Sequence, residues 1–118
     1  MLKEYAQSST VYVVTGYTDM RKSIDGLAAI VSGKFSLDPF DRSLFLFCGK
    51  RRDRLKGLLW EDDGFLLLYK RLDGGSFRWP KCEAEARKLT VQEIRWLLEG
   101  LEIDQPKAIK SSKPGALY

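Results

Sequence analysis

The stretch that decides the fold is residues 49–80, GKRRDRLKGLLWEDDGFLLLYKRLDGGSFRWP. Five positive charges fall within residues 50–56, where Asp53 is the one opposing charge. Two leucine-rich runs, 54–61 and 65–72, follow with an Asp-Gly dipeptide between them. Because Asp-Gly favours a two-residue type I′ turn, the stretch predicts a β-hairpin.

The two faces of this hairpin are predicted to differ in chemistry, because successive side chains of a strand point to opposite faces. A turn at Asp63 and Gly64 places Lys56 opposite Arg71. One face then carries Arg54, Lys56, Trp60, Tyr69 and Arg71, and the other carries Leu55, Leu59, Leu66, Leu68 and Leu72. The first face is typical of a polyanion-binding surface and the second of a core. A three-residue loop would instead place Lys56 opposite Lys70 and remove the aromatic rings from the basic face.

The chain has the composition of one folded domain. It has 118 residues, of which 44% are hydrophobic, and its net charge is only +4, so it can bury a core without a partner. We expect a frayed N-terminus at residues 1–10, a single domain at 11–104 and a flexible C-terminal tail at 105–118. The 20 basic and 16 acidic residues permit nucleic-acid binding and do not require it.

Three further strands are predicted outside the hairpin. The β-branched run 11–15 is typical of a strand, and residues 44–48 are apolar on both faces, as in a central strand. Residues 76–79 are predicted to form a short strand that Pro80 ends, because proline cannot donate to the ladder. Residues 81–89 are interpreted as a polar connection.

Two main helices are predicted. The first follows a cap at Thr18 or Asp19 and ends near Gly33. The second begins with a capping box at residues 90–93, TVQE. Its apolar positions are Ile94, Leu97, Leu98 and Leu101. The order β-α-β-β-β-β-α predicts an α+β domain, with a mostly antiparallel sheet of about five strands packed on one or both helices.

Several chemistries are excluded by the residues present. There is no histidine and there are two cysteines, so a four-ligand structural zinc site and a nucleophile paired with histidine are both out of reach. Cys48 is expected to be a small buried hydrophobe. We predict no cofactor and no catalytic residue. The carboxylates Asp19, Asp25 and Asp62 keep open the alternative of a metal-dependent nuclease.

The cysteine usage also bears on the compartment. Two separate cysteines, with no signal peptide and no apolar run long enough to span a membrane, indicate reduced thiols and a cytoplasmic protein.

The best candidate site is the set of cations and aromatic rings around the hairpin. Lysine and arginine displace the counterions of a phosphate backbone, and interleaved aromatic rings can stack on unpaired bases. The candidate nucleic-acid-binding residues are Lys50, Arg51, Arg52, Arg54, Lys56, Trp60, Tyr69 and Arg71. Arg21 and Lys22 extend the patch. The alternative interpretation is a solvated sheet face kept soluble by its charges.

Trp96 is a separate candidate. It lies off the apolar stripe of the last helix, so it is predicted to be exposed and to contact a protein partner.

Several separated motifs resemble one known family. They are TDMRKSIDGLA at 18–28, FLFCGKRRDRLKGLLWEDDGFLLLYKRL at 45–72, GSFRWP at 75–80 and LTVQEIRWLLEGLEI at 89–103. In this order they resemble the small TnpB-type accessory protein of the bacterial insertion-sequence family numbered sixty-six, the product of its second reading frame. The resemblance implies an accessory role in transposition beside a separate, larger transposase, and it offers no catalytic residues.

Three functions therefore remain for testing. The leading hypothesis is a non-enzymatic transposition accessory protein. It contacts nucleic acid, with DNA as the first candidate, or the transposase, or both. The second is a protein-interaction module that docks on the transposase and has no contact with DNA. The third is a metal-dependent nuclease. The sequence does not fix the oligomeric state.

Overall fold

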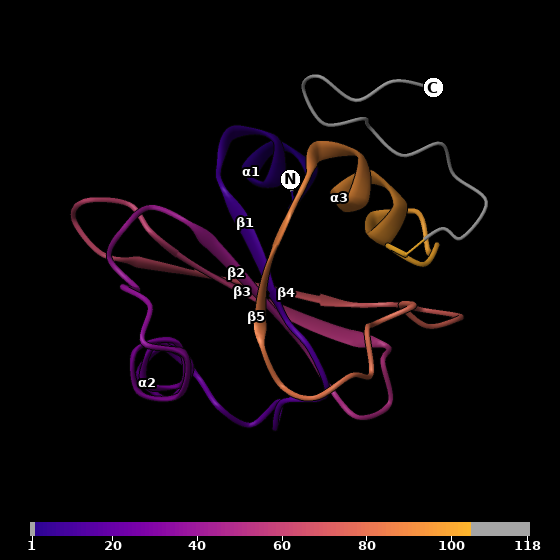
Figure 1. Ribbon diagram of the computed structural model, residues 1–118, viewed down its shortest axis with the longest axis horizontal. Coiled ribbons are helices and arrows are strands. Elements are labelled where there is room, and N and C mark those ends of the chain that lie inside the picture. Colours follow the sequence, from indigo (N-terminus) through magenta and orange to yellow (C-terminus); the bar gives the residue numbers. More distant parts are fainter. Residues whose placement is uncertain (1, 105–118) are drawn as a thin grey trace, which may run out of the picture.

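The computed structural model describes residues 2–104 and is built on one five-stranded sheet (Figure 1). The strands are β1 (Val11–Val14), β2 (Leu44–Cys48), β3 (Arg54–Trp60), β4 (Phe65–Arg71) and β5 (Ala86–Leu89). They lie in the order β4-β3-β2-β1-β5. Only the β1–β2 pair is parallel within this sheet, and the other three pairs are antiparallel. The predicted α+β fold with a mostly antiparallel sheet is confirmed.

Helices cover both faces of this sheet. Helix α2 (Ile24–Ala29), which continues into a π-helical turn at Ile30–Lys34, lies on one face. Helices α1 (Leu2–Ser8) and α3 (Val91–Leu98) lie together on the other face (Figure 1). Among residues 2–104, no helix is long and apolar enough to cross a membrane.

Strand β2 is the centre of the core, as its sequence predicts. All five of its residues are buried. Leu44, Leu46 and Cys48 pack in the cluster beneath α1 and α3, whereas Phe45 and Phe47 pack in the cluster beneath α2. The alternation of side chains along one strand therefore joins both halves of the core.

The predicted strand at residues 76–79 is wrong. These residues are part of an irregular connection, and the last strand is β5, in the segment interpreted as a polar connection. Phe77 and Trp79 are buried, but as anchors of the connection: the Trp79 indole N–H donates to the Val14 carbonyl at 2.8 Å. Because β5 is an edge strand, it needs few apolar residues, and sequence patterning alone gives it little signal.

The N-terminal segment also differs from the prediction. Residues expected to be frayed form helix α1, with Ala6 buried and with Leu2 and Tyr5 packed against the core. The helix thus covers apolar surface beside α3. The predicted flexible tail at 105–118 lies outside the described residues.

Helix α2 begins later than predicted. Ser23 occupies its N-cap position, so the predicted cap at Thr18 or Asp19 is wrong. Residues 15–23 instead form a connection that leaves the sheet before the helix starts.

The hairpin turns one residue earlier than predicted. The Glu61 N–H donates to the Gly64 carbonyl at 2.9 Å, and Asp62 adopts a left-handed φ of 75°. Lys56 therefore lies opposite Tyr69 and not opposite Arg71. Since the pairing shifts by two residues, every side chain keeps its predicted face.

Packing at the tip of the hairpin explains why the observed register is favoured over the predicted one. The observed register places Trp60 opposite Phe65, with ring centres 5.0 Å apart, and Phe40 packs against both rings. Arg42 forms an ion pair with Asp62 in the turn. Aromatic cross-strand packing of this kind stabilises a sheet beyond its backbone hydrogen bonds.

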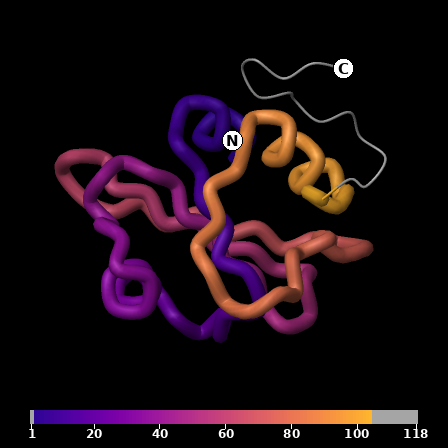
Figure 2. Tube along the Cα trace, in the orientation of Figure 1, coloured from indigo at the N-terminus to yellow at the C-terminus, as the bar shows by residue number. Residues whose placement is uncertain are grey.

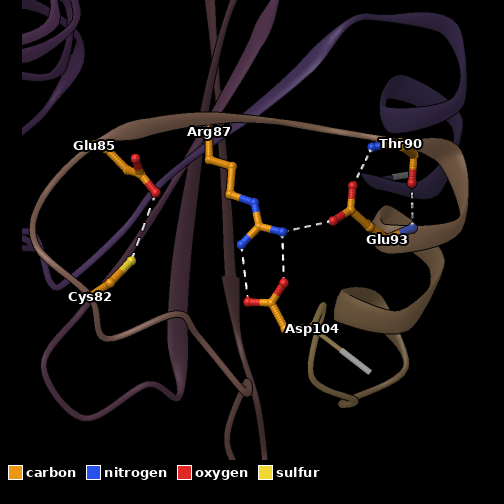
Figure 3. A network of polar contacts seen from close by, with 6 residues as sticks. All are labelled: Cys82, Glu85, Arg87, Thr90, Glu93 and Asp104. Atoms are coloured by element: carbon orange, nitrogen blue, oxygen red, sulfur yellow. Dashed lines mark hydrogen bonds and ion pairs between the residues drawn. The ribbon is translucent and has the colours of Figure 1, made fainter. Parts of the chain in front are cut away.

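The predicted capping box joins β5 to α3 (Figure 3). The Glu93 N–H donates to the Thr90 hydroxyl at 3.1 Å, and the Thr90 N–H donates to the Glu93 carboxylate at 2.9 Å. Arg87 of β5 also donates to Glu93, at 3.0 Å, and to both carboxylate oxygens of Asp104. The hydrogen bonds that Arg87 donates to Asp104 and Glu93 raise the pKa of Arg87 above its usual value, so its guanidinium stays charged.

Replacing Thr90 tests the cap. Thr90→Ala removes the acceptor for the Glu93 N–H, and we expect the free energy of unfolding in urea to fall by about 1 kcal/mol. Thr90→Ser keeps the hydroxyl and should unfold within a few tenths of a kcal/mol of the native chain. Equal stability of the alanine and serine variants would contradict a stabilising role for the cap.

The two cysteines should differ sharply in reactivity. Cys48 is buried, as predicted, and burial raises the pKa of its thiol to about 12, whereas Cys82 is exposed. Because the thiolate is the reactive form, a thiol reagent at pH 8 should modify one cysteine of the folded protein and both in denaturant. Rapid modification of Cys48 in the folded protein would contradict its burial at the end of β2.

Candidate nucleic-acid interface

Three connections meet at one end of the sheet. Strands β1, β2 and β4 end there and β3 and β5 begin there, so residues 15–23, 49–53 and 72–85 come together (Figure 2). The basic residues of these connections and of the adjoining ends of β3 and β4 are Arg21, Lys22, Lys50, Arg51, Arg52, Arg54, Lys56, Lys70, Arg71, Arg78 and Lys81. The acidic ones are Asp19, Asp53, Asp73, Glu83 and Glu85. Cations outnumber carboxylates here more than in the whole chain, which has 20 basic and 16 acidic residues.

A cleft of about 360 Å³ opens between the first two connections. It is lined by residues 17–21 on one side and by Gly49, Lys50, Arg51, Asp53 and Arg54 on the other. We call this the basic cleft. Its walls come from two of the motifs that carry the family resemblance, and the fold brings them into contact although some 30 residues separate them.

Gly49 allows the two walls to meet. A Cβ atom at this position would lie 2.7 Å from Met20 Cγ, closer than real carbon contacts. The Thr18 N–H also donates to the Cys48 carbonyl at 2.8 Å. On the other wall, the Arg52 N–H donates to the Gly49 carbonyl at 2.9 Å and closes the turn. The cleft is therefore held by backbone contacts and by one close approach that requires glycine.

The charge of the cleft is positive because its lining cations, Arg21, Lys50, Arg51 and Arg54, outnumber its carboxylates, Asp19 and Asp53. Asp19 accepts hydrogen bonds from the Arg21 backbone and guanidinium, the shortest at 2.7 Å. The Arg21 guanidinium lowers the pKa of Asp19, so this carboxylate stays ionised and balances Arg21. No described carboxylate forms an ion pair with Lys50, Arg51 or Arg54. The unneutralised charge of this wall is available to an anion.

Arg54 is half-buried in the wall of the cleft. Its Nε and the Asp53 Oδ1 are both buried, and neither has a hydrogen-bond partner in the described chain. Arg54 is also one of the residues that line the cleft. Because hydrogen bonds from a guanidinium to a phosphate are charge-assisted and strong, Arg54 is a suitable phosphate-binding residue of this wall.

The hairpin extends the basic cleft across its neighbouring face. Arg54 lies opposite Arg71, and Lys56 lies opposite Tyr69. The Lys56 ammonium donates to the Lys22 carbonyl at 2.7 Å and lies 5.7 Å from the centre of the Tyr69 ring. The predicted grouping of these two cations with Arg71 and Tyr69 on one face therefore holds in the structure.

Three predicted site residues lie elsewhere. Arg52 turns away from the basic cleft and lines a second cleft of about 300 Å³ with Arg78 and Lys81. Trp60 packs at the far end of β3 with Phe40, so it does not lie among the cations. Trp96, predicted to be exposed, is half-buried.

Sequence reasoning missed Tyr17. Its side chain lines the basic cleft, is 67% exposed and has the Lys50 ammonium 5.8 Å from its ring centre. The signal was its position directly before the TDMR motif, in the connection that follows the predicted strand at 11–15.

The candidate carboxylates for metal binding do not converge. Asp19 is paired with Arg21, Asp62 is paired with Arg42, and Asp25 is exposed on α2. No group of three or more Cys, Asp or Glu in the described residues is placed to hold a metal ion. The geometry expected of a two-metal site is not formed by these residues.

Comparison with known proteins gives the family. The family described as "IS66 Orf2 like protein" matches residues 9–108. The chain belongs to this family. Membership implies an accessory role in transposition, as the motifs on the walls of the basic cleft predict.

Two relatives from Sinorhizobium fredii (strain NBRC 101917 / NGR234) support this assignment. "Uncharacterized protein y4hO" is 37% identical over 102 residues, which cover 86% of this chain and 88% of the relative. "Uncharacterized protein y4jC" is 31% identical over 104 residues, which cover 88% and 89%. No solved structure matches the chain.

Replacing Gly49 tests the contact that shapes the cleft. Gly49→Ala should force Met20 away, and we expect the free energy of unfolding to fall by about 1–3 kcal/mol, the usual cost of overpacking. Gly33→Ala is the matched control, because a Cβ there meets nothing within 4 Å. Urea denaturation of both variants is the measurement, and equal stability would contradict the close approach.

Proposed function

We propose that this chain is a non-catalytic accessory protein that contacts nucleic acid, in the first place DNA, during transposition. The contact surface is the basic cleft together with the adjoining hairpin face. Its phosphate-binding residues are Lys50, Arg51, Arg54, Lys56 and Arg71, with Arg21 and Lys22 at the margin. The observation that carries the proposal is that two distant motifs meet around one cleft whose Lys50, Arg51 and Arg54 have no carboxylate partner among residues 2–104.

Counterion release supplies the driving force. Each phosphate neutralised on duplex DNA contributes about −0.9 to the slope of log affinity against log salt. Five contacts predict a slope of about −4.5, so affinity should fall roughly 500-fold between about 50 and 200 mM salt. A surface that merely keeps the protein soluble would show no such dependence.

The pairing of the candidate metal ligands within residues 2–104 fits a non-catalytic role. The chain has no histidine. The candidate metal ligands Asp19 and Asp62 are each bound to an arginine. We therefore assign a binding role to this site. A binding role fits an accessory protein that acts beside a separate transposase.

The hairpin tip supports the second candidate function, docking on the transposase. Phe40 is 53% exposed and packs on Trp60 and Phe65, forming an aromatic cluster at the end of the hairpin opposite the basic cleft. Exposed aromatic clusters are common at protein interfaces. This cluster replaces half-buried Trp96 as our candidate for a partner contact, and both partners could bind at once.

Charge reversal tests nucleic-acid binding. Lys56→Glu with Arg71→Glu removes two phosphate contacts, so affinity for a DNA duplex should fall and the salt slope should become shallower by about 2. Fluorescence anisotropy at several salt concentrations is the measurement.

The matched control is Lys34→Glu with Arg95→Glu, which changes net charge equally at exposed positions away from the cleft. Affinity should change little in that variant. Native affinity in the Lys56→Glu, Arg71→Glu variant would sink the proposal, and a pull-down with the transposase would then test the docking module.

A further inference from the structure

We infer that the basic cleft and hairpin face accept an unpaired nucleic-acid strand, with Tyr17 and Tyr69 stacking on its bases. The inference rests on the proposed function and names its substrate class. Two exposed tyrosines, each beside a lysine ammonium, belong to the same cationic surface.

Tyr17 is presented from a fixed backbone. The Gly16 N–H donates to the Pro80 carbonyl at 2.9 Å, and the Thr18 N–H donates to the Cys48 carbonyl at 2.8 Å. The residue between these two anchors is 67% exposed. A ring held at its base and open to solvent loses little freedom when a base stacks on it.

Tyr69 is similarly placed on the hairpin. It is 54% exposed on the outer strand β4, with the Lys56 ammonium 5.7 Å from its ring centre. Lys56 is held in turn by the Lys22 carbonyl at 2.7 Å. The Lys56 ammonium and the Tyr69 ring are therefore already held beside each other before a ligand binds.

The two tyrosine–lysine pairs lie on either side of an arginine pair. Arg54 lines the cleft beside Tyr17 and Lys50, and it lies opposite Arg71. Lys56 follows Arg54 on the same strand face, about 6.6 Å along the strand. Along this surface the order is therefore a tyrosine ring, the cations and a second tyrosine ring. This order suits a nucleic-acid strand whose phosphates bind the arginines while its bases turn toward the tyrosines.

The aromatic rings favour an unpaired strand over a duplex. In a duplex the bases stack on one another and present phosphates outward, so exposed rings at the surface have no base to meet. In an unpaired strand every base has a free face, and stacking on aromatic rings beside a cationic groove is the common mode of binding. The basic cleft, at about 360 Å³, is within the size range of small-ligand sites and has room for one nucleotide.

The test compares strands of one length. Native protein is titrated by anisotropy into a labelled 12-nucleotide oligo-dT, the same length of oligo-U, and a 12-base-pair duplex. We expect tighter binding to a single strand than to the duplex. Tyr17→Ala should weaken single-strand binding about 5- to 150-fold and leave duplex binding within about twofold, whereas Tyr17→Phe should bind like the native chain.

The control is Val91→Ala, which removes an exposed apolar side chain on α3 and should change neither affinity. Tighter binding of oligo-dT or of oligo-U assigns the strand to DNA or to RNA, and either supports the inference. Salt-sensitive duplex binding with no effect of Tyr17→Ala or Tyr69→Ala overturns the inference and leaves the proposed function standing. Absence of binding to all three probes overturns both.

Discussion

The close approach of Met20 to Gly49 is the contact on which the candidate site depends. It seats the connection after β1 against the connection after β2, and the Thr18–Cys48 hydrogen bond fixes their register. Only with these walls in contact do Tyr17 and Lys50 share a cleft with Arg54. A larger residue than glycine at position 49 would force the Met20 side chain to shift in this contact.

The two ends of the sheet carry surfaces of different chemistry. Strand β2 is buried throughout, and the chain passes within two residues from buried Cys48 to exposed Lys50. Such an abrupt change requires a core that extends to the very end of the sheet. The opposite end carries the aromatic cluster of the hairpin tip. Because the cationic and aromatic surfaces lie at opposite ends of β3, the nucleic-acid contact and the transposase contact that we propose do not overlap.

Patterns that rest on short-range periodicity were readable from the sequence, and those that rest on tertiary context were not. The buried run of β2, the faces of the hairpin and the Thr90 capping box follow from local chemistry, and all three are present. Edge strand β5 and helix α1 bury only part of their surfaces against the core. Their sequences are therefore largely polar, and the periodicity of apolar residues does not reveal them. The hairpin register followed aromatic packing with Phe40, a residue outside the hairpin. The same limit applies to the site: spacing grouped Lys56 with Tyr69, but only the fold shows that Tyr17 belongs with them and that Trp60 does not.

The most direct test of the central claim is an NMR titration of isotope-labelled protein with an unlabelled oligonucleotide. Binding at the basic cleft predicts that the largest amide shifts fall in residues 17–22 and 49–56 and around Tyr69, with the hairpin tip and α3 nearly unchanged. Added salt should reverse the shifts in all of these residues together. Shifts concentrated at the hairpin tip or on α3, with residues 17–22 and 49–56 unaffected, would contradict the assignment of this end of the sheet as the nucleic-acid interface.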